Sequence, residues 1–369
     1  MNRMFTGASI LSFLFFASYG QTEINLSGLR FIRELTIDYN KSFNGTEIGG
    51  LSGIDYDPHA QVYYLISDEE DARFYTAKLL ISQLGIDSLN FLSVGSFLQT
   101  GFPLPSSRPN QTLGIDPEAI RVNQKTRQLV WTSEGERKIK EKAFVNPSIN
   151  IAWIDGKFVD SFPVPPNLAM QHSDNGPRKN GTLEGLAFAN DFKTLYVSLE
   201  EPLYEDGPRS SLAETNSWVR FYQFDIDSKK NVAQYAYRLE PIAYPSSPDD
   251  AFKMDGISEI LTIGHKKLLV VERSYSTGRA GCTVKVFIAD LSLASDIKDN
   301  SSLRVNSSFK PIEKKLLLNM DELGIYIDNI EGVTFGPDLP NGHKSLVFVS
   351  DNNFQEIQKT QILLFEVIP

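Results

Sequence analysis

Residues 182–202 read TLEGLAFANDFKTLYVSLEEP: an alternating apolar strand, a short polar turn, and a second apolar strand that ends in two glutamates. Four other segments share this layout, and they begin at Gly49 (GGLSGIDYDPHAQVYYLISDEE), Asp116 (DPEAIRVNQKTRQLVWTSEGE), Gly256 (GISEILTIGHKKLLVVERS) and Asn329 (NIEGVTFGPDLPNGHKSLVFVSDNN). Their corresponding residues lie 66 to 74 positions apart, at Ser52, Glu118, Glu184, Ser258 and Glu331. Five ordered matches at such intervals indicate a repeat architecture.

Two more predicted strands follow each of the first four hairpins, whereas only QILLFEVIP, residues 361–369, follows the fifth. We expect LRFIRELTI, residues 29–37, to supply the missing strand. The sequence therefore predicts an all-β fold, a single β-propeller over residues 21–369 with five four-stranded blades. Six blades are the alternative if one has diverged, and the N-terminal strand closes the ring in either case. A β-sandwich would not require a five-fold repeat.

The N-terminus has the layout of a secretory signal peptide. Residues 1–20 read MNRMFTGASILSFLFFASYG, with an early arginine, an apolar run and then small residues. This run is short for a membrane span, and no later stretch is long and apolar enough for one. We therefore expect a cleaved signal peptide at 1–20 and a secreted or periplasmic protein without a transmembrane segment.

Composition narrows the classes of partner. The 36 Lys and Arg residues against 46 Asp and Glu give a formal net charge of −10, spread along the chain. Nucleic-acid binding needs clustered cations, so it is disfavoured. The single cysteine, Cys282, excludes an intrachain disulfide and a cysteine-built zinc site. The oligomeric state is left open.

Acidic residues recur at one end of the predicted hairpins. The start of a first strand and the end of the second lie at the same level, and Glu118 with Glu134 and Glu184 with Glu200 are each 16 positions apart. Carboxylates gathered at one rim repel unless a cation neutralises them, and calcium accepts irregular carboxylate geometry. The predicted calcium ligands are Asp68, Glu118, Glu134, Glu184, Glu200, Glu331 and Asp351. Alternatively, these residues cap strand ends, form ion pairs or lie in solvent.

Long connections on the same side carry basic residues, which would suit a small anionic or ester substrate. We expect Arg73, Lys253 and Arg273 to bind it. The expected catalytic residues are Glu184, Glu331, Glu272 and Arg273, with a rim carboxylate as general base and the arginine stabilising developing charge.

Several of these phrases resemble the phytase-like family, described as having esterase-like activity of phytase. They are GGLSGIDYDP, YYLISDE, DPEAI, LEGLAF, LYVSLEE, GISEIL, LLVVERS, DNIEGVTFGP and VFVSDNNF. The resemblance implies a propeller and calcium-dependent phosphoester hydrolysis. By this resemblance, the motif positions of the family correspond in this sequence to Glu118, Glu184, Glu272, Glu331, Asp351 and Arg273.

Two functions follow from the sequence. The first is an exported calcium-dependent hydrolase that acts on phosphoester or other ester substrates at the acidic rim. The second is a non-catalytic propeller that binds a ligand or a protein and holds a structural metal.

Overall fold

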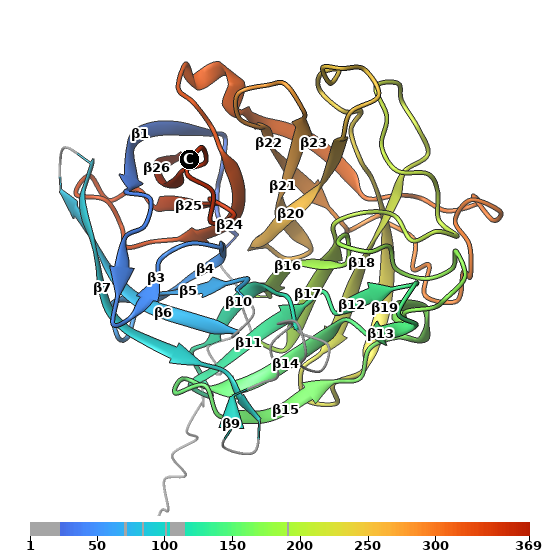
Figure 1. Ribbon diagram of the computed structural model, residues 1–369, viewed down its shortest axis with the longest axis horizontal. Coiled ribbons are helices and arrows are strands. Elements are labelled where there is room, and N and C mark those ends of the chain that lie inside the picture. Colours follow the sequence, from blue (N-terminus) through green and yellow to red (C-terminus); the bar gives the residue numbers. More distant parts are fainter. Residues whose placement is uncertain (1–22, 70–71, 83–84, 100–101, 104–114, 190–191) are drawn as a thin grey trace, which may run out of the picture.

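The computed structural model describes residues 23–69, 72–82, 85–99, 102–103, 115–189 and 192–369. Five four-stranded antiparallel sheets stand around a central axis as the blades of a propeller (Figure 1). The all-β prediction and the count of five blades are confirmed. The predicted signal peptide at 1–20 lies outside the described residues.

Each blade runs from an innermost strand at the axis to an outer strand, mostly in chain order. Blades 1 and 2 comprise β4 (Leu51–Asp57), β5 (Val62–Ser67), β6 (Arg73–Ser82) and β7 (Gly85–Ser96), then β10 (Pro117–Asn123), β11 (Gln128–Ser133), β14 (Ser148–Trp153) and β15 (Phe158–Phe162). Blades 3 and 4 comprise β16 (Leu183–Phe188), β17 (Thr194–Leu199), β18 (Trp218–Asp225) and β19 (Asn231–Arg238), then β20 (Lys253–Gly264), β21 (Lys267–Ser276), β22 (Thr283–Asp290) and β23 (Glu313–Asn319).

Blade 5 joins the two ends of the chain. Its order from the axis is β24 (Asn329–Phe335), β25 (Ser345–Asp351), β26 (Thr360–Ile368) and β1 (Gly28–Ile37). β1 pairs antiparallel with β26, from Gly28 opposite Ile368 to Ile37 opposite Thr360. The N-terminal strand thus closes the ring as predicted.

Smaller elements lie in the connections. They are the hairpins β2 (Ser42–Phe43) with β3 (Thr46–Glu47), β8 (Leu98–Gln99) with β9 (Phe102–Pro103) and β12 (Glu136–Lys138) with β13 (Ala143–Val145), and the 3₁₀ turns η1 (Pro166–Leu168) and η2 (Met320–Leu323). Among the described residues, no helix is long and apolar enough to cross a bilayer.

The hydrophobic core lies between neighbouring blades. One cluster joins Ile66 of blade 1 to Ile120 of blade 2, and there the rings of Phe97 and Trp131 stack with centroids 4.4 Å apart. Similar clusters join blade 5 to blade 1 and blade 4 to blade 5. The inner strands therefore bury apolar side chains on both faces, which fixes the blades relative to one another.

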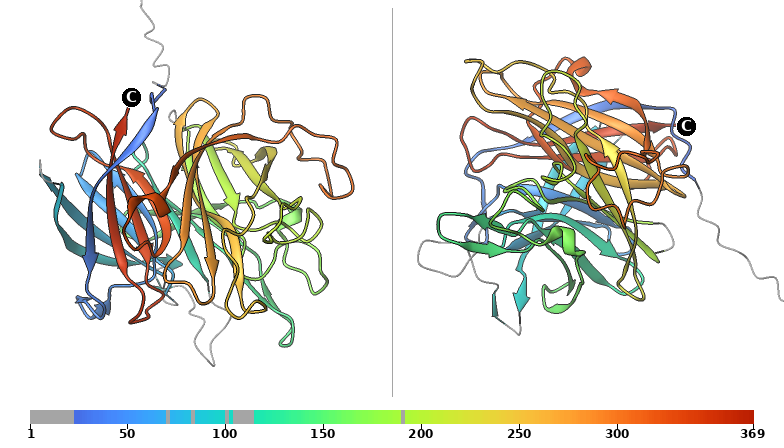
Figure 2. Two further views of the ribbon diagram at one scale, coloured as in Figure 1. Left: turned by 90° about the horizontal axis from the view of Figure 1, so that it is seen from above. Right: turned by 90° about the vertical axis from the view of Figure 1, so that its right-hand side faces the viewer.

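The segment between β22 and β23 covers the outer edge of blade 3. The backbone amides of Ile297 and Ile312 donate to the carbonyls of Gln234 and Ala236 on β19, each at 2.8 Å. Figure 2 shows this segment leaving blade 4 and running along the outside of its neighbour. It protects an edge strand that would otherwise expose unpaired backbone groups.

A buried ion pair crosses the centre of the ring. The Arg121 guanidinium of β10 lies 2.7 Å from the Glu259 carboxylate of β20. Arg121 also donates to carbonyls of the inner strands of blades 1, 4 and 5, at Ile54, Ile260 and Val333. Glu259 accepts from the backbone amide of Leu186 in blade 3. This Arg121–Glu259 latch therefore ties together the innermost strands of all five blades.

Candidate functional site

A cavity of about 900 Å³ opens at one end of the central channel. Its lining includes all seven predicted calcium ligands: Asp68, Glu118, Glu134, Glu184, Glu200, Glu331 and Asp351. These seven residues come from blades 1, 2, 3 and 5, and Arg273 and Tyr275 of blade 4 line the same space. The hairpin spacing correctly placed them at one rim, because each pair joins the start of an inner strand to the end of its neighbour.

A β-bulge lies at the corresponding position in every inner strand. The pairing skips one residue at Ser52, Glu184, Ser258 and Glu331, and it is irregular around Glu118. A bulge leaves its extra residue outside the ladder and redirects the side chain. The repeat positions found in the sequence are therefore the positions at which the backbone leaves regular pairing beside the cavity.

Glycine follows some of these bulges because the inner strands approach closely there. A Cβ on Gly332 would lie 2.9 Å from the backbone nitrogen of Ile54 in the next blade. The Glu-Gly sequence at 331–332 thus combines a side chain aimed at the cavity with close contact between blades.

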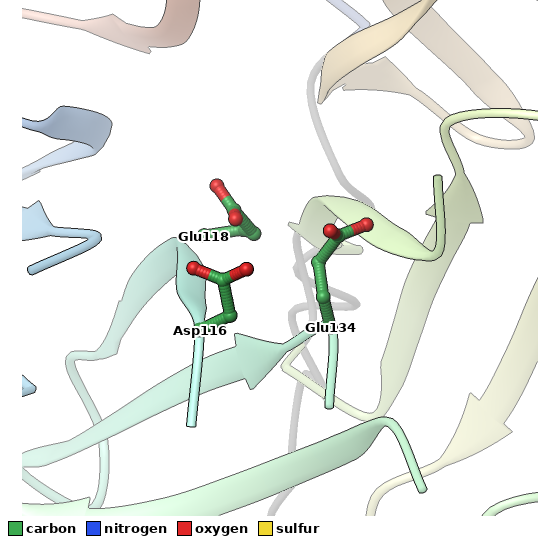
Figure 3. A group of neighbouring side chains, drawn as sticks. All are labelled: Asp116, Glu118 and Glu134. Carbon is green, nitrogen blue, oxygen red and sulfur yellow. The ribbon is translucent and has the colours of Figure 1, made fainter. Parts of the chain in front are cut away.

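Two groups of three carboxylates are compact enough to hold a cation. Oxygens of Asp116, Glu118 and Glu134 lie within 4.8 Å of one another (Figure 3), and so do oxygens of Glu134, Glu184 and Glu200. Glu134 belongs to both groups. It is fixed by the backbone amides of Gly181, at 2.8 Å, and Thr182, which donate to its Oε1.

Two of these carboxylates form no direct hydrogen bond or ion pair with the described residues, although the charge of Arg273 acts on Glu184. Glu118 and Glu184 are each only 8% exposed, and within the described part of the chain no hydrogen bond or ion pair reaches either side chain. The Oδ1 atom of Asp68 is likewise buried without a partner. Carboxylates with few donors in a confined space are costly, so these groups could hold a cation.

The electrostatics of the cavity favour protonated carboxyls when no cation is bound. Burial, followed by repulsion from neighbouring carboxylates, raises the pKa of Asp116 to about 6 and that of Glu134 and Asp351 to about 8. The same causes, again led by burial, raise the pKa of Asp68, Glu118 and Glu184 well above its usual range.

Arg273 is a buried cation that lies among these carboxylates. It forms ion pairs with Glu331 and with Glu200, the latter at 2.8 Å, and it also donates to Asn329. Burial opposes its charge, but Glu331 and Glu200 outweigh burial and raise its pKa. Asn329 donates to Glu331 at 2.8 Å. Arg273 therefore fixes carboxylates from blades 3 and 5.

The other three expected site residues lie elsewhere, outside the lining that the described residues form. Glu272 precedes Arg273 on β21 and points to the opposite face, where it accepts hydrogen bonds from the Tyr237 hydroxyl, the Glu240 backbone amide and the Lys314 ammonium. The Lys253 ammonium donates to the Asp249 carbonyl at 2.6 Å.

The hydrogen bonds and the ion pair of Arg73 also lie outside the cavity lining. It forms an ion pair with Glu69 and donates to the Tyr75 hydroxyl and the Glu47 carbonyl.

Sequence reasoning missed several residues of the lining. Asp116 lies two positions before Glu118, a spacing that places side chains on the same face of a strand and was visible in the sequence. Arg209 and Asn329 also line the cavity. They come from a connection and a strand end, where a repeat of apolar strands gives no signal.

Comparison with solved structures finds matches at low similarity. A β-1,3-galactosidase of group GH43, BT3683, is 11% identical with a TM-score of 0.47, over 89% of this chain and 94% of that one. The exo-β-1,3-galactanase Pc1,3Gal43A of Phanerochaete chrysosporium is 11% identical with a TM-score of 0.46, over 90% and 64% of the two chains. The RRP9 WD40 repeats are 9% identical with a TM-score of 0.35, over 93% and 100%.

None of the curated proteins compared with the chain matches it. A family model does match, over residues 46–354, and its description is "Phytase-like: Esterase-like activity of phytase". This match spans most of the chain and includes every residue of the acidic cavity named above. The chain belongs to the phytase-like family.

Proposed function

We propose that this protein is an exported calcium-dependent hydrolase of phosphoesters or other esters, acting in the acidic cavity. The observation that carries the proposal is the pair of carboxylates Glu118 and Glu184, each 8% exposed at the cavity. Within the described residues no hydrogen bond or ion pair reaches either side chain. Burial, followed by neighbouring carboxylates, raises the pKa of both, although Arg273 opposes the shift at Glu184. Family membership agrees with a hydrolase. Export rests on the signal-peptide pattern of residues 1–20.

The donor set suits a hard cation. The two carboxylate groups, which share Glu134, offer only carboxylate oxygens. Calcium takes six to eight oxygen ligands and tolerates irregular geometry, whereas zinc prefers nitrogen and sulfur. Asp116, Glu118, Glu134, Glu184 and Glu200 would hold the ion. When bound, calcium supplies positive charge to substrate oxygens and acidifies a water molecule.

The other polar residues of the cavity would hold the general base in place and take up the proton of the attacking water. Arg273 and Asn329 hold one oxygen of Glu331, so this carboxylate has a fixed direction beside the cavity. In the proposed reaction water attacks the phosphorus or carbonyl carbon, Glu331 accepts the water proton, and the ester bond to the leaving alcohol breaks. The alcohol then receives that proton. Glu272 has no part in this step, since it bonds on the other face of β21.

Calcium binding and hydrolysis can be tested separately. We expect metal-stripped protein to bind calcium in calorimetry and to hydrolyse p-nitrophenyl phosphate or p-nitrophenyl acetate only after calcium is restored. Glu118→Gln and Glu184→Gln should each weaken calcium binding at least about tenfold, because each removes a charged ligand. Glu331→Gln should retain calcium and lose hydrolysis.

Glu313→Gln is the matched control, since Glu313 lies exposed on the outer strand β23. It should behave as the unaltered protein. Protein that binds no calcium, or hydrolysis that is insensitive to calcium, would refute the proposal. Calcium binding without hydrolysis of either ester would favour a ligand-binding propeller with a structural metal.

A further inference from the structure

The inner hairpin of blade 4 is longer than those of the other blades. β20 and β21 have 12 and 10 residues, whereas β16 and β17 of blade 3 have 6 each. The extra residues continue past the level of Arg273, which pairs with Gly256. Beyond it Met254 pairs with Tyr275. Since alternate residues share a face, Tyr275 lies on the same side as Arg273, and both line the cavity.

This extension gives one side of the cavity an apolar lining. We name as the apolar wall Phe252, Met254 and Tyr275 of blade 4 and its approach, Tyr326 before blade 5, and Ile357 between β25 and β26. The ring centroids of Phe252 and Tyr275 lie 6.0 Å apart. Phe252 is 55% exposed and Ile357 is 84% exposed. Apolar side chains exposed together around a cavity are typical of a binding surface.

The rest of the cavity differs in chemistry. Most of the carboxylates and Arg273 are buried at the inner end, the carboxylate floor, and Lys179 and Arg209 line the blade 3 side. Arg279, which follows β21, lines the blade 4 side with its guanidinium over the Tyr244 ring, so the apolar wall has a cation beside it. Arg273 lies at the foot of the apolar wall, two positions before Tyr275 on β21. A molecule that reaches the floor therefore passes directly alongside aromatic and aliphatic groups.

We propose that the ligand of this cavity is amphiphilic: its anionic or ester group reaches the carboxylate floor while an aryl or acyl group packs on the apolar wall. A small polyanion without carbon surface would leave the wall exposed to water. The inference deepens the proposed function, on which it rests for placing the polar group at the calcium ligands. It selects aryl and acyl esters as the substrate class.

Two pairs of stable probes test this inference by binding alone. Methylphosphonate is compared with phenylphosphonate, and acetate with phenylacetate, by calorimetry on calcium-loaded protein. In each pair the polar group is the same and only the phenyl group differs. We expect the phenyl member to bind on the order of tenfold more tightly, as burial of an aromatic ring predicts. Phe252→Ala and Tyr275→Ala should each reduce that ratio and leave methylphosphonate or acetate unchanged.

Phe158→Ala is the matched control, because Phe158 is a comparably exposed aromatic residue on the outer strand of blade 2. It should keep the full ratio. Equal binding within both pairs, absence of binding by all four probes, or an equal loss in Phe158→Ala would overturn the inference. Ester hydrolysis without phenyl preference would overturn it and leave the proposed function standing. Phenyl preference without hydrolysis would support the amphiphilic ligand and remove the enzymatic function.

Discussion

Glu134 belongs to both carboxylate groups, and its environment shows how single residues set the chemistry of the cavity. Two backbone amides bond one of its oxygens, yet burial and the nearby Asp116 still raise its pKa to about 8. The hydrogen bonds therefore orient the carboxyl without stabilising its charge enough at neutral pH. A cation would complete that stabilisation.

The first prediction concerns pH. Carboxyls with raised pKa bind more protons in the folded than in the unfolded state between their ordinary and raised values. Without metal, the contribution of these groups to the free energy of unfolding should therefore be highest below about pH 4, the ordinary pKa of a carboxyl group, and should fall as pH rises to about 8, the pKa of Glu134 and Asp351. Denaturant unfolding of metal-stripped protein at pH 5 and pH 8 measures this.

Saturating calcium is the control for that experiment. In the proposed site calcium would bind the deprotonated carboxylates, so it should stabilise the protein more at pH 8 than at pH 5, and its affinity should rise with pH. Stability of the stripped protein that rises from pH 5 to pH 8, with no gain from calcium, would contradict the assignment of these carboxyls.

The second prediction concerns Arg273. Arg273→Met leaves Glu331 and Glu200 without their counter-ion, and removal of one partner of a buried ion pair costs about 3–5 kcal/mol. We expect a loss of that order in the free energy of unfolding of metal-stripped protein at pH 8. Lys157→Met, which breaks the exposed pair with Asp155, should cause no measurable change. Equal stability of the two variants would show that Arg273 does not hold the carboxylates.

At the scale of strands, the repeat pattern made the fold predictable. The five inner hairpins, the outer strands and the role of residues 29–37 follow from apolar alternation and turn residues, because burial between blades imposes that alternation. The small hairpins in the connections were not predicted. The fixed spacing from Glu118 to Glu134 likewise placed the rim carboxylates correctly.

The limits of prediction also appear at this scale. Glu272 and Arg273 were expected in one site, although neighbours in a strand face opposite sides; only Arg273 lines the cavity. The bonds of Lys253 and Arg73 depend on loop carbonyls and side chains whose positions no periodic pattern gives. The apolar wall was missed because its residues resemble core residues in the sequence.

The third prediction tests closure of the ring by β1. Leu35 packs against the core of blades 5 and 1, whereas the adjacent Thr36 is exposed. Leu35→Asp should lower the melting temperature clearly, since it places a charge in that core, and Thr36→Asp should change it little. Thermal unfolding followed by circular dichroism provides the comparison. Similar melting temperatures for both variants would indicate that β1 contributes little to blade 5.

At the scale of the whole molecule, the Arg121–Glu259 latch joins all five blades at the axis. Both side chains of this ion pair are buried, and its structural role is to hold the inner strands in one arrangement. Burial raises the pKa of Glu259 to about 7 even though Arg121 opposes the shift. The acidic cavity therefore stands at one end of a ring whose centre is filled by protein groups.

The fourth prediction addresses this latch. Arg121→Met should lower the free energy of unfolding by about 3–5 kcal/mol, because it leaves Glu259 buried and unpaired. Adding Glu259→Gln should recover part of that loss, so the double variant should be more stable than the sum of the single changes predicts. Denaturant unfolding of the two single variants and the double variant measures the coupling. Strict additivity would mean that the two residues do not act as a pair.

The pairing of β1 with β26 also has a consequence for the order of folding. Blades 1 to 4 each consist of neighbouring segments, so they can assemble while the ribosome is still translating the chain. Blade 5 can form only after Thr360–Ile368 (β26) has been translated. Until then β1, the first strand of this blade to be translated, has no partner strand. Closing so long a loop is slow. A circular permutant that links Gly28 to Ile368 and opens the chain between blades 2 and 3 would make blade 5 local, and it should refold faster than the natural order.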